Sequence, residues 1–371
     1  MDEDISRYHY FPTSYDEGRR WFRALVQDQA AHLTRFENPH AHGPAGEALT
    51  TELAWFGRRD APRVFLSICG THGQEYFAGA AGQLSWLSSD APAALPDDVA
   101  VCLVHAHNPY GAAFVSRGNE NFVDLNRNYF PPGKKVRPNP LVDALFNLLF
   151  TQEVDEHILD NVMGRFYTFA ENNDTKAVMT AMGGGQDTHP KGILYCGTGD
   201  EWSTQTLRNI VESYLLHAQK VAVIDWHTGL GDYGTLTVLN DMPPHTDAYR
   251  WTCTWWAGPE GRDALIAPED QPDYIGHVNK GVADDLHAHG IICAHVVMEF
   301  GTFDNQGVLA ALMIDRWLRF ECEDVNSPHA IEMRAKMLER LNPSMPGWRK
   351  AVVECSTDMY RRTIHGLSTW T

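Results

Sequence analysis

The sequence predicts an α/β fold in which a mainly parallel sheet is covered by helices on both faces, giving a three-layer αβα sandwich. Short apolar runs rich in branched residues recur along the chain and alternate with segments whose apolar residues recur every three or four positions. Strands that alternate with helices favour a parallel sheet between two helical layers. Such sheets bind ligands at the carboxyl ends of their strands, so the chemistry is expected there.

Five apolar runs are interpreted as buried strands: residues 64–69, 99–105, 221–225, 236–239 and 291–300. Apolar periodicity predicts helices over residues 79–87, 141–150 and 308–317, and another helix with Ser203 as its N-cap. Residues 328–371 are also helical in pattern, with Ile331, Leu338 and Leu341 on one side. This last stretch is expected to pack on the outside of the sheet.

Composition limits the classes of function. The 371 residues contain no internal repeat, low-complexity tract or linker, so a single domain over residues 1–371 is expected. The net charge of −18 repels phosphate backbones, which argues against a nucleic-acid partner. No run approaches the roughly 18 apolar residues of a membrane span, and the acidic N-terminus lacks a secretory signal, so no membrane partner and a cytoplasmic location are expected. The seven scattered cysteines form no C-x-x-C pair, so reduced thiols are expected.

The first candidate for chemistry is an H-x-x-E pair just after the run over residues 64–69. Glycines on both sides of the histidine allow a tight turn, and a helix is expected to begin near Glu75. His72 and Glu75 would lie on one helical turn, where an imidazole and a carboxylate could bind one metal ion. The spacing alone is weak, because His329 and Glu332 repeat it on what looks like a solvated helix face. Only the first copy follows a buried strand.

Two later strands end in further candidates. A catalytic zinc takes three protein ligands and one open position, and His227, directly after the run over 221–225, is the best third ligand. Glu299 lies inside the run over 291–300, where a carboxylate without a partner is costly. There it could take a proton from a metal-bound water and deliver it to a departing amine. The non-functional alternatives are that His227 is a hydrogen-bonded histidine in a turn and that Glu299 pairs with a structural arginine.

Residues 117–129, RGNENFVDLNRNY, are unusually polar for a connection between core elements. Dense polarity usually indicates a surface loop, but Arg117 and Arg127 near a metal could clamp an anionic substrate and stabilise a developing oxyanion. Residues 183–186, GGGQ, lack the G-K-[ST] of a phosphate-binding loop and are expected to form a flexible loop near the mouth of the site. The absence of a G-x-S-x-G elbow argues against a serine hydrolase.

The order of these motifs resembles the zinc carboxypeptidase superfamily over residues 60–305: H-x-x-E, then D-x-N-R, then a histidine after a strand, then the glutamate of E-F-G-T. The resemblance implies a mixed, mainly parallel sheet of the carboxypeptidase type, with residues 306–371 as a helical elaboration. It implies one zinc ion held by His72, Glu75 and His227. It also implies that Glu299 is the general base and acid.

The same resemblance assigns roles to the polar segment. Asp124 would orient the first zinc histidine through its other ring nitrogen. Asn126 and Arg127 would hold the terminal carboxylate of a substrate. Arg117 is the counterpart of the arginine that polarises the scissile carbonyl, although its spacing from D-x-N-R is shorter than in digestive members of the superfamily.

The chain also departs from the carboxypeptidase pattern. Its third-ligand motif, DWHT at 225–228, resembles the D-x-H-T of the succinylglutamate desuccinylase and aspartoacylase branch, whose members cleave N-acyl amino acids. The mobile substrate tyrosine of the family has no marked equivalent; Tyr274 is the candidate, and Tyr233 is another. In overall character the chain is most similar to an uncharacterised bacterial branch, which implies a fold and a metal but no known substrate.

The sequence therefore predicts a hydrolase, a zinc metallopeptidase of the carboxypeptidase type that cleaves an amide bond next to a free carboxylate. The nearer alternative is an N-acyl amino-acid deacylase with the same zinc site, and the further one is a non-catalytic metal-binding protein. The expected partner is a small peptide or acyl-amino-acid substrate.

Overall fold

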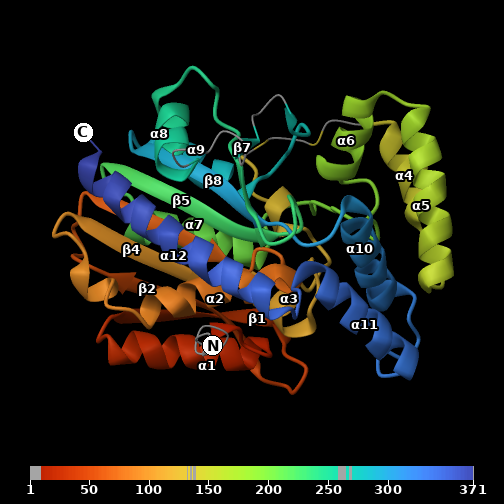
Figure 1. Cartoon of the computed structure of the whole chain (residues 1–371), viewed down its shortest axis with the longest axis horizontal. Helices are drawn as coiled ribbons and strands as arrows, with labels where there is room; N and C mark the ends of the chain where they lie inside the picture. The colour runs from red at the N-terminus through yellow and green to blue at the C-terminus, as the bar shows by residue number, and fades with distance from the viewer. Residues whose placement is uncertain are drawn as a thin grey trace.

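The computed structural model describes residues 10–131, 133, 136, 139–257, 265–266 and 270–370. Eight strands form one sheet in the order β1-β2-β4-β3-β5-β8-β6-β7 (Figure 1). Their bounds are β1 His32–His42, β2 Ala48–Phe56, β3 Arg63–Cys69, β4 Val99–His105, β5 Lys220–Thr228, β6 Leu236–Leu239, β7 Leu265–Ile266 and β8 Ile292–Phe300. All five predicted strands are confirmed, as β3, β4, β5, β6 and β8.

The sheet is mixed, with a parallel centre. The strands β4, β3, β5 and β8 are neighbours and run parallel, which is the arrangement that alternation with helices predicts. At one edge β2 pairs antiparallel with β4 and with β1. At the other edge β6 runs antiparallel to β8 and parallel to β7. The carboxyl ends of β3, β5 and β8 therefore open on the same side of the sheet.

Helices cover both faces of the sheet, as the sequence predicts. On one face α1, α2, α8 and α12 bury apolar side chains against the strands, and Figure 1 shows α12 running diagonally across them. On the other face α7 and α9 do the same. The bounds are α1 Tyr15–Asp28, α2 Tyr76–Leu87, α7 Trp202–Tyr214, α8 Asp247–Trp256, α9 Val278–Ala288 and α12 Pro346–Thr369.

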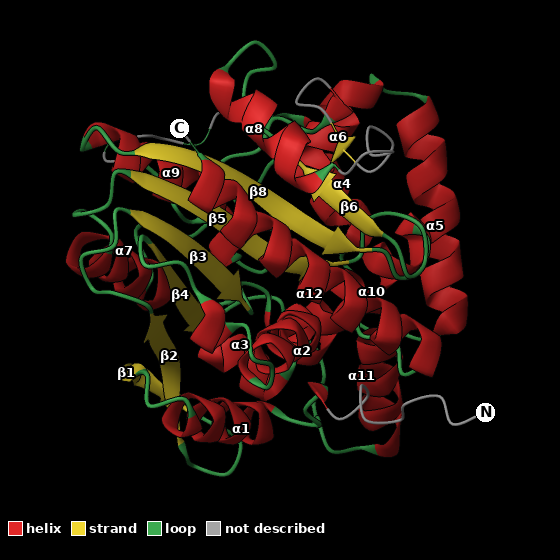
Figure 2. Cartoon of the chain, turned by 60° about the vertical axis from the view of Figure 1, so that its left-hand side comes forward, coloured by secondary structure: helices red, strands yellow, loops and turns green. Residues whose placement is uncertain are grey.

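A further group of helices lies together on one side of the molecule (Figures 1 and 2). It consists of α4 Leu141–Leu149, α5 Glu156–Glu171, α6 Thr175–Gly183, α10 Asn305–Phe320 and α11 Pro328–Leu341. Apolar side chains of α5, α10 and α11 form one cluster, and α4 packs on α6. The group reaches the carboxyl end of β5, where the Thr228 hydroxyl donates to the carbonyl of Leu341.

Two expectations about the helices are wrong in detail. The N-cap of α7 is Glu201, so the helix begins before Ser203, which lies inside it and is buried. Ile331 on α11 is 54% exposed, and the buried face of that helix consists of Ala330, Met333, Met337 and Leu341. The helix that packs on the sheet is α12, which buries Trp348 and Tyr360. In the described part of the chain, no helix is long and apolar enough to cross a membrane.

The turn after β3 depends on a close approach between two glycines. Residues Gly73–Glu75 form the short 3₁₀ helix η2, which lies against α3, Pro109–Phe114. A Cβ atom added to Gly73 would lie 1.7 Å from the carbonyl carbon of Gly111, and the Gly73 N–H donates to the carbonyl of Ser116 at 3.1 Å. Only glycine fits between these backbones, so this contact fixes where η2 lies.

We predict that Gly73→Ala lowers the free energy of unfolding by about 3 kcal/mol, because the new methyl group must displace backbone rather than a mobile side chain. Urea denaturation would measure the change. Gly347→Ala is the matched control, since nothing lies within 4 Å of a Cβ added there. Equal stability of the two variants would contradict the close approach.

Candidate metal centre

The first two candidate ligands lie in the turn that leaves β3. Gly70 has a φ of +73°, which lets the chain turn sharply after Cys69. His72 is the N-cap of η2 in an extended conformation, and Glu75 is the last residue of η2. The side chains of His72 and Glu75 therefore face each other, with 2.9 Å between Nδ1 and Oε1. The predicted helix follows directly as α2.

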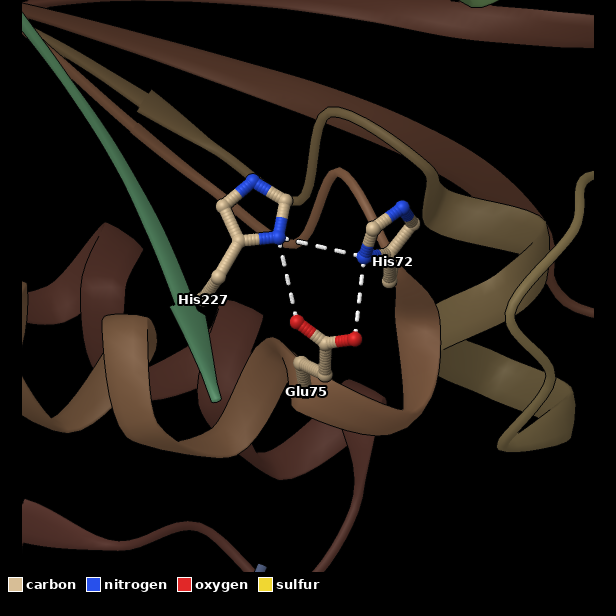
Figure 3. Close-up of side chains that lie close together, drawn as sticks. All are labelled: His72, Glu75 and His227. Carbon is tan, nitrogen blue, oxygen red and sulfur yellow. Dashed lines mark hydrogen bonds and ion pairs between the residues drawn. The ribbon is translucent and has the colours of Figure 1, made fainter. Parts of the chain in front are cut away.

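The third candidate comes from the neighbouring strand. Because β3 and β5 are parallel with Cys69 opposite Trp226, His227 lies beside the turn that carries His72. Its Nδ1 atom is 3.1 Å from Glu75 Oε2 and 3.1 Å from His72 Nδ1 (Figure 3). The three side chains are buried, and within the described residues they are the one set of three or more His, Cys, Asp or Glu that could hold a metal ion.

The outer nitrogen of each imidazole is bound to a carboxylate. His72 Nε2 lies 3.0 Å from Asp124 Oδ1, and His227 Nε2 lies 2.8 Å from Asp225 Oδ2. The Thr71 hydroxyl donates to the other oxygen of Asp225 at 2.8 Å. These contacts are satisfied when each Nε2 carries the proton, which leaves both Nδ1 lone pairs facing inward beside Glu75. Two imidazole nitrogens and one carboxylate are a donor set that suits zinc.

The charges around the group favour a cation at its centre. Burial alone would raise the pKa of Glu75, but the imidazoles of His72 and His227 hold that pKa below its usual value. Burial would lower the pKa of His227, but the carboxylates of Asp225 and Glu75 raise it well above the usual value. A buried position that stabilises an extra positive charge on histidine fits a metal ion by the same electrostatics.

Glu299 lies next to this group on β8. The register of the parallel pair places Glu299 directly opposite His227, so the two side chains point to the same face of the sheet. Glu299 is half-buried, and its Oε2 has no hydrogen-bond partner among the described residues. Burial raises the pKa of Glu299 to about 7, with the charge of Glu75 adding to the rise and that of His227 opposing it. Among the described residues, Glu299 does not form an ion pair with a structural arginine.

Arg117 is brought to the group by two carboxylates. Its Nε donates to Asp124 Oδ2 at 2.8 Å and its Nη1 to Glu75 Oε1 at 3.3 Å. Its backbone N–H donates to the buried carboxylate of Asp315 on α10 at 2.7 Å. The Arg117 side chain keeps 14% of its surface exposed.

Arg127 and Asn126 lie in the short 3₁₀ helix η4, Leu125–Arg127, close to Asp124. Arg127 Nε donates to the carbonyl of Gly183 at 2.7 Å and Nη1 to the carbonyl of Asn126 at 2.6 Å. Asn126 Oδ1 accepts from the backbone N–H of Val278 at 3.0 Å. The two bonds of Arg127 use two of the five N–H groups of a guanidinium.

The glycine-rich segment after α6 encloses Arg127. A Cβ added to Gly185, whose φ is +99°, would lie 3.1 Å from Arg127 Cδ and 2.9 Å from Ile275 Cγ1. The backbone N–H of Ile275 donates to the carbonyl of Gly184 at 3.1 Å. The sequence predicts only a loop near the mouth of the site for these glycines, and the structure adds that Gly183 and Gly185 lie against Arg127.

The two candidate tyrosines lie in different surroundings. The guanidinium of Arg127 lies over the ring of Tyr274, 4.8 Å from its centroid, and the ring of His277 stacks on Tyr274 at 4.1 Å. Tyr233 is 44% exposed and contacts Phe303. The structure therefore groups Tyr274, and not Tyr233, with Arg127. The sequence gives no role to Asp315, and it names Asp225 only as part of the D-x-H-T motif. The i, i+2 spacing of Asp225 and His227 was the signal for their contact, because it puts both side chains on one face of a strand.

Solved structures of carboxypeptidase-like proteins align with most of this chain. The metallo-carboxypeptidase of Burkholderia cenocepacia aligns with a TM-score of 0.51 at 12% identity, over 98% of this chain and 71% of that one. Bovine thrombin-activatable fibrinolysis inhibitor, solved with a tick carboxypeptidase inhibitor, gives a TM-score of 0.48 at 11% identity, over 95% and 99% of the two chains. Carboxypeptidase A of Helicoverpa armigera gives 0.47 at 12%, over 88% and 73%.

The first of these alignments confirms that the chain has the α/β fold of a metallocarboxypeptidase, as the motif order predicts. No curated protein matches the sequence. A family described as proteins of unknown function, DUF2817, matches residues 11–355. Because this match spans most of the 371 residues, the chain belongs to the DUF2817 family.

Proposed function

We propose that this protein is a zinc-dependent hydrolase that cleaves an amide bond next to a free carboxylate. The observation that supports it best is the convergence of His72, Glu75 and His227 with Glu299 on the adjacent strand. A metal-binding group of this composition beside a carboxyl oxygen that has no hydrogen-bond partner among the described residues is an arrangement for hydrolysis. The carboxypeptidase-like fold agrees with this proposal.

His72, Glu75 and His227 would hold one zinc ion. Bound there, zinc would supply a Lewis acid that lowers the pKa of water and polarises a carbonyl group. Asp124 and Asp225 hold the two imidazoles in the orientation that points their Nδ1 atoms inward. The protein thereby fixes the ligand geometry before any cation arrives.

Glu299 would act as the general base and then as the general acid. It removes a proton from the attacking water and delivers it to the departing amine, so one carboxyl serves both steps. Its place supports this role, because it lies beside His227, keeps some exposure and has an oxygen without a partner in the described structure. A pKa of about 7, raised chiefly by burial, suits a group that must accept and release a proton near neutrality.

The two arginines, Arg117 and Arg127, would have different roles in binding and catalysis. Arg117, held by Asp124 and Glu75 next to the metal group, would stabilise the negative charge that develops on the carbonyl oxygen. Arg127 and Asn126 would hold the free carboxylate of the substrate and so set which bond reaches Glu299. The guanidinium of Arg127 is oriented by two backbone carbonyls, which prepares its remaining N–H groups for a carboxylate.

We predict that the zinc-loaded protein cleaves substrates with a free terminal carboxylate and that Glu299→Gln lowers kcat by about 10²- to 10⁴-fold, the usual effect of a lost general base. Mass spectrometry of a mixture of peptides, C-terminally amidated peptides and N-acyl amino acids would detect products. Zinc content, measured by elemental analysis, should be unchanged in Glu299→Gln.

Glu332→Gln is the control, because Glu332 belongs to the other H-x-x-E pair and is 59% exposed on α11. Cleavage of N-acyl amino acids alone would favour the deacylase alternative with the same metal group. Cleavage of neither class with zinc bound would leave the non-catalytic alternative, and full activity of Glu299→Gln would contradict the role of that residue.

We predict that Asp225→Asn weakens zinc binding by about 10- to 100-fold. The amide can still accept from Thr71, but its NH₂ group would face the protonated Nε2 of His227, which favours the tautomer that no longer offers Nδ1 as a ligand. Competition with a chromogenic chelator would measure the affinity. Asp232→Asn, at an exposed position after the same strand, should bind zinc as the wild type does. Equal affinities of both variants would exclude this role of Asp225.

We predict that Gly185→Ala raises KM for free-carboxylate substrates by about tenfold while kcat changes little, because a methyl group on this positive-φ residue presses on Ile275 and Arg127 and not on Glu299. Steady-state kinetics would separate the two constants. Gly290→Ala is the control, because Gly290 also has a positive φ, of +77°, and a Cβ there meets nothing within 4 Å. A parallel fall of kcat and kcat/KM in Gly185→Ala would show instead that the segment acts on the chemical step.

A further inference from the structure

The carboxylate of Asp315 on α10 holds the main chain at the candidate oxyanion-stabilising arginine. Its Oδ2 atom accepts from the backbone N–H of Arg117 at 2.7 Å and from the hydroxyl of Ser116 at 3.2 Å. Asp315 is 4% exposed and belongs to the group of helices beside the sheet. Its contact therefore joins that group of helices to the loop that carries Arg117.

The same helix also holds the chain on both sides of Arg117. Arg319 lies one turn after Asp315 on α10. Its guanidinium donates to the hydroxyl of Tyr110, which precedes Arg117, and to the carbonyl of Glu120, which follows it. Arg319 thus fastens the flanking chain to α10, while Asp315 fastens the main chain of Arg117 itself.

The chain reaches Arg117 through a strained residue. Val115, the C-cap of α3, has φ +55° and ψ +49°, a left-handed conformation that is rare for a β-branched side chain. Such a residue keeps its conformation only when the surrounding structure holds it there. Ser116 is held by backbone contacts, because its N–H donates to the Gly111 carbonyl at 2.9 Å and its carbonyl accepts from the Gly73 N–H at 3.1 Å. The next N–H along the chain, that of Arg117, relies on a side chain.

A carboxylate is a costly acceptor in this buried place. Burial raises the pKa of Asp315 to about 6, although the N–H of Arg117, the hydroxyl of Ser116 and the charges of Arg117 and Arg319 oppose the rise. Asparagine has nearly the same shape and could accept from the same N–H without burying a charge. A charged acceptor, however, binds an N–H about twice as strongly as a neutral one. The carboxylate therefore favours a firm hold on Arg117 over the stability of its own surroundings.

The position of the Arg117 main chain determines where its guanidinium can lie. Its Nε donates to Asp124 Oδ2 at 2.8 Å, but its Nη1 is 3.3 Å from Glu75 Oε1, at the long limit of hydrogen bonding. A small shift of the main chain would break the second bond. A donor that stabilises a developing oxyanion acts only within a narrow range of distances, so the same shift would remove that stabilisation.

We propose that Asp315 is a positioning residue, which holds the main chain of Arg117 so that the guanidinium lies beside Glu75 and stabilises the charge that develops on the carbonyl oxygen. This inference rests on the proposed function. It makes α10 part of the active site, because the carboxylate that holds the arginine comes from that helix. Since Asp315 acts on Ser116 and Arg117, its loss should change kcat, with little change in zinc binding or KM.

A double-mutant cycle tests whether Asp315 acts through the guanidinium. Because Asp315 binds the backbone of Arg117, the contact remains when the arginine side chain is replaced. We expect Asp315→Ala to lower kcat for a free-carboxylate substrate about 100-fold in the wild type, with zinc content unchanged. In the Arg117→Gln background the same substitution should lower kcat by no more than about threefold. An equal loss in both backgrounds would show a general structural role and overturn the proposal.

Asp315→Asn is the milder variant, because it keeps an acceptor for the N–H and removes only the charge. It should lower kcat about tenfold, and only when the Arg117 side chain is present. If Asp315→Ala does not fold, Asp315→Asn decides, because full activity or an equal loss in both backgrounds would overturn the proposal.

Met333→Ala is the control for stability, because Met333 is 2% exposed on α11 and packs in the same apolar cluster as α10. It should lower the midpoint of urea denaturation and leave kcat unchanged. A fall of kcat in Met333→Ala that matches the fall in Asp315→Ala would mean that looser packing of the helices, and not the contact with Arg117, lowers activity.

A chemical probe separates this inference from the proposed hydrolysis. Phenylglyoxal modifies accessible guanidinium groups, and mass spectrometry measures the rate at each arginine. In Asp315→Ala we expect the rate at Arg117 to rise about tenfold, because the guanidinium leaves Glu75 and Asp124 more often, while the rate at Arg127 stays the same. An unchanged rate at Arg117, or an equal rise at both arginines, would overturn the inference whether or not a substrate is found. A rise at Arg117 alone without cleavage of any substrate would support the hold on Arg117, and only the proposed hydrolysis would fail.

Discussion

The balance of buried charge is the constraint on which the candidate site depends. Two imidazoles are surrounded by four carboxylates and two guanidiniums: Glu75, Asp124, Asp225, Glu299, Arg117 and Arg127. The carboxylates of Glu75, Asp124 and Asp225 outnumber the two guanidiniums, and the pKa of His227, which these carboxylates raise well above its usual value, shows that the group favours one more positive charge. Burying charges without compensation is expensive, so this group of side chains is most stable around a cation. The raised pKa of His227 has the same cause, because the surrounding carboxylates stabilise a positive charge on its ring.

The parallel centre of the sheet is what brings these groups together. His72 and His227 are 155 residues apart in sequence, yet they meet because β3 and β5 are adjacent and end at the same level. Glu299 joins them because β8 is the next strand and pairs with β5 in register. The close approach of Gly73 to Gly111 then sets the turn that presents Glu75. Each of these side chains is thus placed by backbone packing, and the outer carboxylates need only orient the rings.

Local signals in the sequence were enough for the central strands and for the metal group. Runs such as residues 64–69 and 221–225 are buried on both faces, so their sequences are continuously apolar. The polar residues that follow them are therefore easy to recognise. The edge strands β1 and β2 were not predicted, because β1 is largely exposed and β2 contains polar residues. Glu52 in β2 is fully buried but is compensated by Arg23 of α1, a pairing that nothing in the local sequence indicates.

The contacts that would decide specificity are non-local, which is why the sequence could name Tyr274 and Arg127 but not their surroundings. Gly183 and Arg127 are 56 residues apart in sequence. Tyr274, much further along the chain, lies between the Arg127 guanidinium over its ring and the His277 imidazole stacked on it. Each such contact contributes about 0.5–1.5 kcal/mol, so a swing of the ring would lose both. The structure therefore favours a Tyr274 that stays in place between Arg127 and His277, rather than one that moves onto a substrate.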